Sequence, residues 1–251
     1  MTKTNNHNSK IVIIGPKTSI GQCILDQLAQ LNISVTLIRP LDIHQEAGKV
    51  VYYANHRLIT QPLDTFDFNT KHIIFVCDKK IIPLLCRRKR SNMNWWIDCT
   101  HSVHQAQCII PSINGAILKK KHPKWICNPG SSVIALVQIL VPILKAFEIQ
   151  SIQLMMIMGT FFDNPQSSEK LIVQSRHFLT QTPFPEKYHF PQLAFNLIPD
   201  YFNELGSIIQ RQLACFIKPY VYVHTCFAPV VRGCCLLVQL NLRKNYHTSR
   251  L

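Results

Sequence analysis

Cys127-Asn128-Pro129-Gly130-Ser131-Ser132-Val133 is a strand-to-helix turn near the middle of this 251-residue chain. It closes the β-rich run Trp125 to Asn128 and opens the apolar stretch Ile134 to Phe147. Asparagine and proline end the strand, glycine lets the backbone turn sharply, and a serine hydroxyl caps the helix that follows. Because a helix start carries unpaired amides and partial positive charge, the turn suits an oxyanion or a thiolate. The stretch has the form of an active-site turn, with serine at its helix start.

Upstream of this turn, strand and helix patterns alternate. The run Lys10 to Ile14 predicts a strand, residues 15–21 a glycine turn, and Gln22 to Leu31 a helix with apolar residues at helical spacing. Further strands are predicted over 34–38, 50–53, 57–60, 72–77 and 95–98, with a helix over 79–88. This alternation favours a Rossmann-like, doubly wound parallel α/β sheet over residues 1–130.

Downstream the pattern changes. A strand is predicted over Ser151 to Met158, then a polar, proline-containing loop from Gly159 to Pro191 and a helix from Gly206 to Phe216. Two β runs, Tyr220 to Ala228 and Cys234 to Leu242, come last. We expect an α+β second domain over 131–242 and a polar tail over 243–251.

Composition indicates a folded chain, with 47% hydrophobic and 16% charged residues. The net charge is +14, and ten basic residues lie between 79 and 124 against the single acid Asp98. They fall at the ends of predicted elements, as on a solvated face, which argues against specific nucleic-acid binding.

No signal peptide is predicted, and the longest apolar run is shorter than the roughly 20 residues that span a bilayer. We therefore expect a cytoplasmic protein without a membrane segment, whose ten cysteines are reduced thiols. The cysteine spacings show no zinc pattern, so no metal site is predicted.

The central turn resembles the catalytic turn of the aspartate-semialdehyde dehydrogenase family, where asparagine-proline-asparagine-cysteine begins the same helix. In this chain Gly130 stands at the second asparagine and Ser131 at the cysteine. The difference matters because a cysteine readily forms a nucleophilic thiolate, whereas a serine hydroxyl needs a neighbouring base. The resemblance runs from about Lys10 to Leu242.

The first glycine turn resembles the family's G-x-x-G-x-x-G phosphate loop, and the resemblance implies that Gly15, Lys17, Thr18, Ser19, Ile20 and Gly21 bind a dinucleotide. Thr18 replaces the middle glycine where a positive φ is expected, and Pro16 removes a backbone donor, so we expect weak or lost binding. Without the resemblance, a plain strand-to-helix turn is an equal alternative. Arg39 and Ala47-Gly48-Lys49 resemble the stretch near the adenosine ribose, which favours NADP over NAD.

The remaining catalytic positions of the family are also changed. The resemblance puts Met158 at the substrate-orienting glutamine, Phe227 at the arginine, Cys234 at the histidine and His104 at a phosphate-binding arginine. Two ways to rebuild the site stay open: Cys234 could act as the nucleophile, or His101 and His104 could serve as bases for Ser131. Cys127 is interpreted as a core cysteine.

These losses resemble those of the Usg-type paralogues, which keep the dehydrogenase fold and lack the cysteine. We expect an inactive protein of this type that forms a homodimer through its second domain or binds an unidentified protein partner. The alternatives are an active NADP-dependent semialdehyde dehydrogenase of amino-acid biosynthesis and a decaying gene product. Family members continue past residue 242 with a last strand and a helix that packs on the nucleotide domain. We therefore expect apolar surface on that domain, which a partner covers or which leaves the domain unstable.

Overall fold

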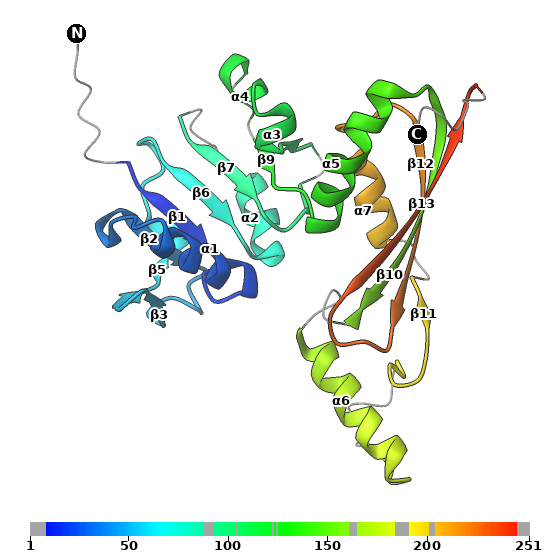
Figure 1. The fold of residues 1–251 in the computed structure, drawn as a ribbon. Helices are drawn as coiled ribbons and strands as arrows, with labels where there is room; N and C mark the ends of the chain where they lie inside the picture. The colour runs from blue at the N-terminus through cyan, green and yellow to red at the C-terminus, as the bar shows by residue number, and fades with distance from the viewer. Residues whose placement is uncertain are drawn as a thin grey trace. The chain divides into compact units, whose positions relative to one another are not determined.

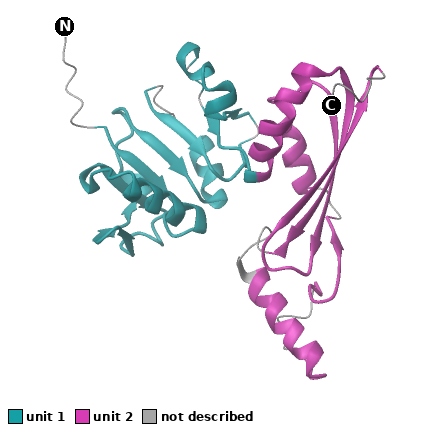
Figure 2. Cartoon of the chain, viewed as in Figure 1, with its two compact units in different colours: residues 1–131 teal, residues 132–251 magenta. Residues whose placement is uncertain are grey.

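A computed structural model describes residues 9–87, 93–103, 105–121, 123, 125–160, 165–183, 191–200 and 204–244. The chain divides into two compact units, Met1–Ser131 (unit 1) and Ser132–Leu251 (unit 2), coloured separately in Figure 2. Of the expected polar tail, only Arg243 and Lys244 are among the described residues.

Unit 1 is built on a seven-stranded sheet in the order β5-β2-β1-β6-β7-β9-β8, with every pair parallel. Its strands are β1 (Ile11–Ile14), β2 (Ile38–Asp42), β5 (Gln61–Pro62), β6 (Ile73–Val76), β7 (Trp95–Asp98), β8 (Gln107–Cys108) and β9 (Ile126–Cys127). A separate antiparallel hairpin joins β3 (Val50–Tyr53) to β4 (His56–Ile59). The predicted parallel α/β sheet is therefore confirmed (Figure 1).

The helices of unit 1 are short apart from the first. They are α1 (Ser19–Gln30), α2 (Ile82–Arg87), α3 (Pro111–Asn114) and α4 (Ile117–Lys120), with 3-10 turns η1 (Val35–Leu37), η2 (Leu63–Thr65) and η3 (Lys79–Ile81). Strand β1 is central and covered on both faces: Val12 and Ile14 pack into one apolar cluster and Ile13 into another. All three are fully buried, which explains the continuous apolar run that predicted this strand.

The second strand lies four residues later than the sequence pattern predicted. Residues 35–37 form the 3-10 turn η1, which begins because the Ser34 hydroxyl accepts a hydrogen bond from the Thr36 amide. The strand itself starts at Ile38, whose side chain is fully buried, and ends at Asp42. The prediction over 34–38 was wrong because it rested on the β propensity of Val35 and Thr36, which a local cap overrides. Arg39 is consequently a strand residue, and Asp42 ends the strand.

Unit 2 contains a mixed four-stranded sheet in the order β11-β12-β10-β13. Its strands are β10 (Ile149–Gly159), β11 (Ile198–Pro199), β12 (Tyr220–Ala228) and β13 (Cys234–Leu242), and its helices are α5 (Ser131–Ala146), α6 (Pro165–Leu179) and α7 (Glu204–Leu213). Strand β10 pairs with β12 in parallel and with β13 antiparallel. The expected α+β character of this part is therefore present.

Helix α6 occupies a stretch that was expected to be loop. Its Leu171 packs with Leu193 and Ala194, and its Gln174 is fully buried. The Gln174 Oε1 accepts hydrogen bonds from the amides of Leu193 (2.7 Å) and Ala194 (3.1 Å), while Nε2 donates to the Pro191 carbonyl (3.2 Å). The prediction failed here because few apolar residues mark the helix, and a buried amide side chain holds it instead.

In the part of the chain that the structure describes, no helix is both long enough and apolar enough to cross a membrane. Nor does any group of three or more His, Cys, Asp or Glu residues among those described come together as a metal site.

Candidate functional site

The turn after β1 needs glycine at both of its ends. Gly15 has φ +78, and its amide donates to the Leu41 carbonyl of β2 at 3.1 Å. A Cβ at Gly15 would lie 2.8 Å from the Cβ of Asp78, and a Cβ at Gly21 only 2.4 Å from the Gly15 carbonyl oxygen. Both contacts are closer than carbon atoms tolerate, so these glycines let helix α1 start directly against the turn.

Thr18 fits the turn without backbone strain. Its φ is −66 and its ψ 157, so the positive φ expected at this position is not needed. Its hydroxyl donates to the Gly15 carbonyl at 2.8 Å and accepts from the Gly21 amide at 3.0 Å, which caps α1. The amides of Ser19 and Ile20 form the rest of the first helical turn, and both residues are exposed, as is Lys17. These donors and the lysine ammonium fit a phosphate group.

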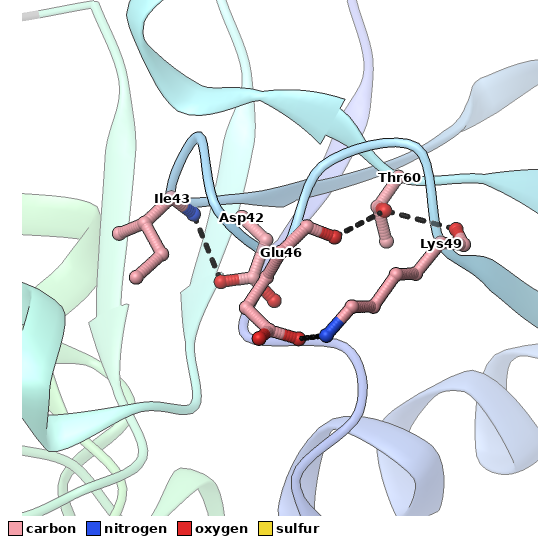
Figure 3. A network of polar contacts seen from close by, with 5 residues as sticks. All are labelled: Asp42, Ile43, Glu46, Lys49 and Thr60. Carbon is pink, nitrogen blue, oxygen red and sulfur yellow. Dashed lines mark hydrogen bonds and ion pairs between the residues drawn. The ribbon is translucent and has the colours of Figure 1, made fainter.

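Asp42 is the residue of this site that sequence reasoning missed. It ends β2, is 5% exposed, and accepts a hydrogen bond at Oδ1 from the Ile43 amide at 2.9 Å (Figure 3). Burial raises the pKa of its carboxyl group; the Ile43 hydrogen bond lowers it, the nearby carboxylates of Asp78 and Glu46 raise it, and Lys17 lowers it. An acid about 20 residues after a phosphate loop is a known nucleotide signal. It was hidden because the strand was placed too early.

The loop that follows Asp42 is tied to the neighbouring hairpin strand. The Thr60 hydroxyl donates to the carbonyl of Glu46 (3.0 Å) and to that of Lys49 (2.9 Å), as Figure 3 shows. The Lys49 ammonium pairs with the Glu46 carboxylate at 2.5 Å, and this ion pair lowers the pKa of Glu46. The lysine charge is therefore already engaged.

Arg39 lies at the other end of the strand. It is in register with Val12, and its Nη1 donates to the carbonyl oxygens of Ile38 (2.7 Å) and Thr36 (3.1 Å). Asp42 lies three positions further along the strand, about 10 Å away along the backbone. Ligands of parallel sheets lie at the carboxyl ends of the strands, where Asp42 and Gly15 are found.

In unit 2 the sheet brings three sequence-predicted site residues into one row. Met158 on β10 is in register with Phe227 on β12 and with Cys234 on β13. Residues in register project from the same face of a sheet, so these side chains are neighbours. Met158 is buried, Phe227 half-buried and Cys234 exposed.

Cys234 is held by its surroundings as a thiol. Desolvation raises the pKa of the Cys234 thiol, a hydrogen bond with the Ser132 side chain lowers it, and the neighbouring Cys235 raises it again, for a net increase. Because the thiolate is the nucleophilic form, a raised pKa makes Cys234 less reactive at neutral pH.

The end of β10 is packed tightly against the connection between β12 and β13. The amide of Gly159 donates to the Gly233 carbonyl and that of Thr160 to the Val230 carbonyl, both at 2.8 Å. A Cβ at Gly159 would lie 2.8 Å from the Val230 oxygen. This packing fixes the position of the row formed by Met158, Phe227 and Cys234.

Ser131 is the first residue of α5 and is exposed. Across the described ranges no hydrogen bond reaches its hydroxyl. The candidate base His101 is instead next to Cys127, with 3.8 Å between Nδ1 and the buried sulfur. The other candidate base, His104, lies outside the described residues.

Asp98 organises the loop that carries His101. It is fully buried, and its Oδ1 accepts hydrogen bonds from the amide and the hydroxyl of Thr100, both at 2.7 Å. Its Oδ2 accepts from the Val103 amide at 2.8 Å. The carboxylate is thus used to hold the loop rather than to face a substrate.

Comparison with known proteins finds similar sequences among the aspartate-semialdehyde dehydrogenases. No family model matches the chain. The chain is 25% identical over 208 residues to the aspartate-semialdehyde dehydrogenase of Shewanella sp. (strain DB6705), covering 78% of this chain and 60% of that protein. It is 24% identical over 215 residues to that of Bacillus subtilis (strain 168), covering 80% and 62%. The chain therefore spans about 60% of the length of these curated relatives.

Solved structures share the fold. A probable aspartate-semialdehyde dehydrogenase from Pseudomonas aeruginosa superposes with a TM-score of 0.83 at 20% identity, covering 96% of this chain and 76% of that one. The aspartate-semialdehyde dehydrogenase with NADP from Candida albicans gives a TM-score of 0.60 at 12% identity, covering 95% and 72%.

Proposed function

We propose that this distant homologue of the aspartate-semialdehyde dehydrogenases keeps their fold and a dinucleotide site but not their catalysis, as Usg-type paralogues do. Its role is then to bind a nucleotide and to assemble with a second copy or another protein. The support comes from the chemistry of the residues at the positions where the resemblance implies catalysis.

One observation carries the proposal: the row of Met158, Phe227 and Cys234 across β10, β12 and β13. A thioether and a phenyl ring carry no charge and no transferable proton, so they neither bind a carboxylate nor shuttle protons. Cys234 has a raised pKa and stays protonated at neutral pH. On this proposal the three residues keep the register of a catalytic row but lack the side chains that catalysis needs.

The size of the loss supports inactivity over a weakened enzyme. Removing a nucleophile or its base alone costs on the order of 10⁴ to 10⁶ in rate, and residues of one catalytic unit do not compensate singly. The exposed Ser131 hydroxyl donates no hydrogen bond to any described residue that could act as its base. We therefore expect turnover near the uncatalysed background.

The test is an assay of reduced nicotinamide formation from aspartate semialdehyde and phosphate, with NAD⁺ and NADP⁺ in separate series. The expected rate of the natural chain equals that of the Ser131→Ala and Cys234→Ala variants. A rate that disappears in either variant would establish the alternative, an active dehydrogenase with a rebuilt site. Ser131→Cys alone is expected to stay inactive, because Met158 and Phe227 are unchanged.

The dinucleotide site rests on unit 1. The sharp Gly15 turn, the capped start of α1 and Lys17 are suited to hold the pyrophosphate, and the carboxyl end of β2 lies beside them. When bound, such a cofactor supplies the hydride acceptor of the family's reaction. Equilibrium binding of the nucleotide, without substrate, tests this part separately from activity.

The proposed homodimer uses the open face of the unit 2 sheet. On β10, Ile152, Leu154 and Met156 are buried on one face, whereas Met155 on the other is only half-buried. In register with Met155 lie the exposed residues His224 and Leu237, the latter 56% exposed. An exposed apolar sheet face is typical of an interaction surface.

Light scattering tests this assembly. The natural chain is expected to have twice the mass of the Leu237→Lys variant, which places a charge in the interface. Leu179→Lys on α6, at a side chain that is 76% exposed, is the matched control and should remain dimeric. A monomeric natural chain that also captures no partner would count against the proposal.

A cooperative thermal transition would exclude the alternative of a decaying, poorly folded gene product. The cytoplasmic location stays a prediction.

A further inference from the structure

The carboxylate of Asp42 stands beside the first residue of the phosphate turn. Strands β1 and β2 pair Ile14 with Leu41, so the next residues, Gly15 and Asp42, are adjacent at the carboxyl edge of the sheet. The Gly15 amide donates to Leu41, which fixes this arrangement. At this edge a nucleotide whose phosphates meet the Gly15 turn extends its adenosine ribose toward the end of the second strand.

One oxygen of Asp42 remains available. Its Oδ1 accepts the Ile43 amide, which orients the carboxylate, as Figure 3 shows. Its Oδ2 accepts no hydrogen bond from any residue in the described ranges, although the side chain as a whole is 5% exposed. An oriented carboxylate oxygen that can still be reached is an acceptor suited to a ribose hydroxyl.

The charges around this oxygen are predominantly negative. The carboxylates of Asp78 and Glu46 both repel a charge on Asp42, and the Lys17 ammonium acts against them. Lys49 is held by Glu46, and Arg39 donates to carbonyl oxygens at the other end of the strand. A ribose 2′-phosphate placed here would bring about two further negative charges next to these carboxylates.

We propose that Asp42, supported by Glu46, selects a dinucleotide whose adenosine ribose has a free 2′-hydroxyl, and so makes this chain prefer NAD to NADP. The inference rests on the dinucleotide site proposed above and goes beyond it, because it fixes the chemistry of the ribose end. It also reverses the preference that Arg39 indicated in the sequence.

The cost of keeping Asp42 supports a role in binding. Burial of a carboxylate is unfavourable, and the neighbouring acids add to that cost rather than relieve it. An asparagine of the same shape would accept the Ile43 amide without the charge. A residue that lowers stability without a compensating contact is expected to have a functional role, and the buried carboxylate of Asp42 is such a residue.

Isothermal titration of the whole chain with NAD⁺ and with NADP⁺ tests the proposal without any turnover. For the natural chain, NAD⁺ is expected to bind at least about tenfold more tightly than NADP⁺. Asp42→Asn should weaken the binding of NAD⁺ and bring the ratio of the NAD⁺ and NADP⁺ affinities to near unity. Glu46→Gln removes the ion pair with Lys49 and should strengthen the binding of NADP⁺ several-fold. Asp42 is unchanged in this variant, so NAD⁺ should still bind.

Glu148→Gln is the matched control, because it changes the net charge equally and disrupts an exposed pair with Lys244 in unit 2. It should leave both affinities unchanged. Equal or tighter binding of NADP⁺ by the natural chain, or an unchanged ratio in Asp42→Asn, would overturn this inference and leave the dinucleotide site standing. Failure to bind either dinucleotide would remove both.

Discussion

The hydroxyl of Thr18 accepts a hydrogen bond from the backbone amide of Gly21 at 3.0 Å and donates one to the carbonyl of Gly15 at 2.8 Å. One side chain thus links both glycines of the turn and caps helix α1. Threonine is compatible with the middle position of this loop because its φ of −66 does not require glycine.

Thr18→Ala is expected to destabilise unit 1 by about 1 kcal/mol, because the cap and its hydrogen bond are lost. Urea unfolding followed by tryptophan fluorescence measures this, since Trp95, Trp96 and Trp125 all lie in unit 1. Thr18→Ser retains the hydroxyl and should lose much less. Equal losses in the two variants would contradict the cap.

Asp98→Asn should cost unit 1 about 2–3 kcal/mol, because a buried charged acceptor of three hydrogen bonds is replaced by an amide that cannot satisfy them all. The same fluorescence experiment detects it. Asp26→Asn, on the exposed face of α1, changes the charge equally and should leave the midpoint within about 0.5 kcal/mol.

Asp42→Asn is expected to stabilise unit 1 at neutral pH. The pKa of Asp42 is raised above its ordinary value of 3.8, mainly by burial. Between the ordinary and the raised pKa the folded state therefore binds more protons than the unfolded state. Stability therefore falls as pH rises through that interval. The variant removes this loss, so its gain in unfolding midpoint should be present at about pH 7 and absent at about pH 3. A variant equally stabilised at both pH values would refute the assignment.

His72 is expected to make the stability of unit 1 fall as the pH is lowered, the opposite of the effect of Asp42. It is 2% exposed, its Nδ1 accepts from the Lys10 amide at 3.1 Å, and burial lowers its pKa below 6.5. The unfolded chain then takes up a proton first as the pH falls, so stability is present above about pH 6.5 and lost below it. His72→Asn, which keeps an acceptor near Lys10, should reduce the loss of stability between about pH 7 and pH 5. The exposed His56→Asn is the control and should keep the natural profile.

Burial patterns explain how much of the fold the sequence predicted. Val12, Ile13 and Ile14 are buried on both sides, so a continuous apolar run marked β1 and the parallel sheet around it. The strand predicted over residues 34–38 was wrong because Ser34 caps a 3-10 turn there. This local hydrogen bond is not reflected in strand propensity. That shift of four residues hid Asp42 and placed Arg39 after the strand, whereas Arg39 lies within β2.

The row of Met158, Phe227 and Cys234 was found through the family resemblance rather than through periodicity. The register between β10 and β13 places Met158 beside Cys234, 76 positions later in the chain, which no local pattern specifies. The contact between His101 and Cys127 was likewise out of reach, because it depends on a loop that the buried Asp98 shapes.

The carboxamide of Gln174 is chemically a peptide group, and in this protein it behaves as one. Its oxygen accepts from two amides and its nitrogen donates to a carbonyl, so it joins helix α6 to the segment 191–194 by the same kinds of hydrogen bond that pair two strands. The exposed positions of that helix, such as Leu179, are consequently free to change in evolution as long as Gln174 and the buried Leu171 persist.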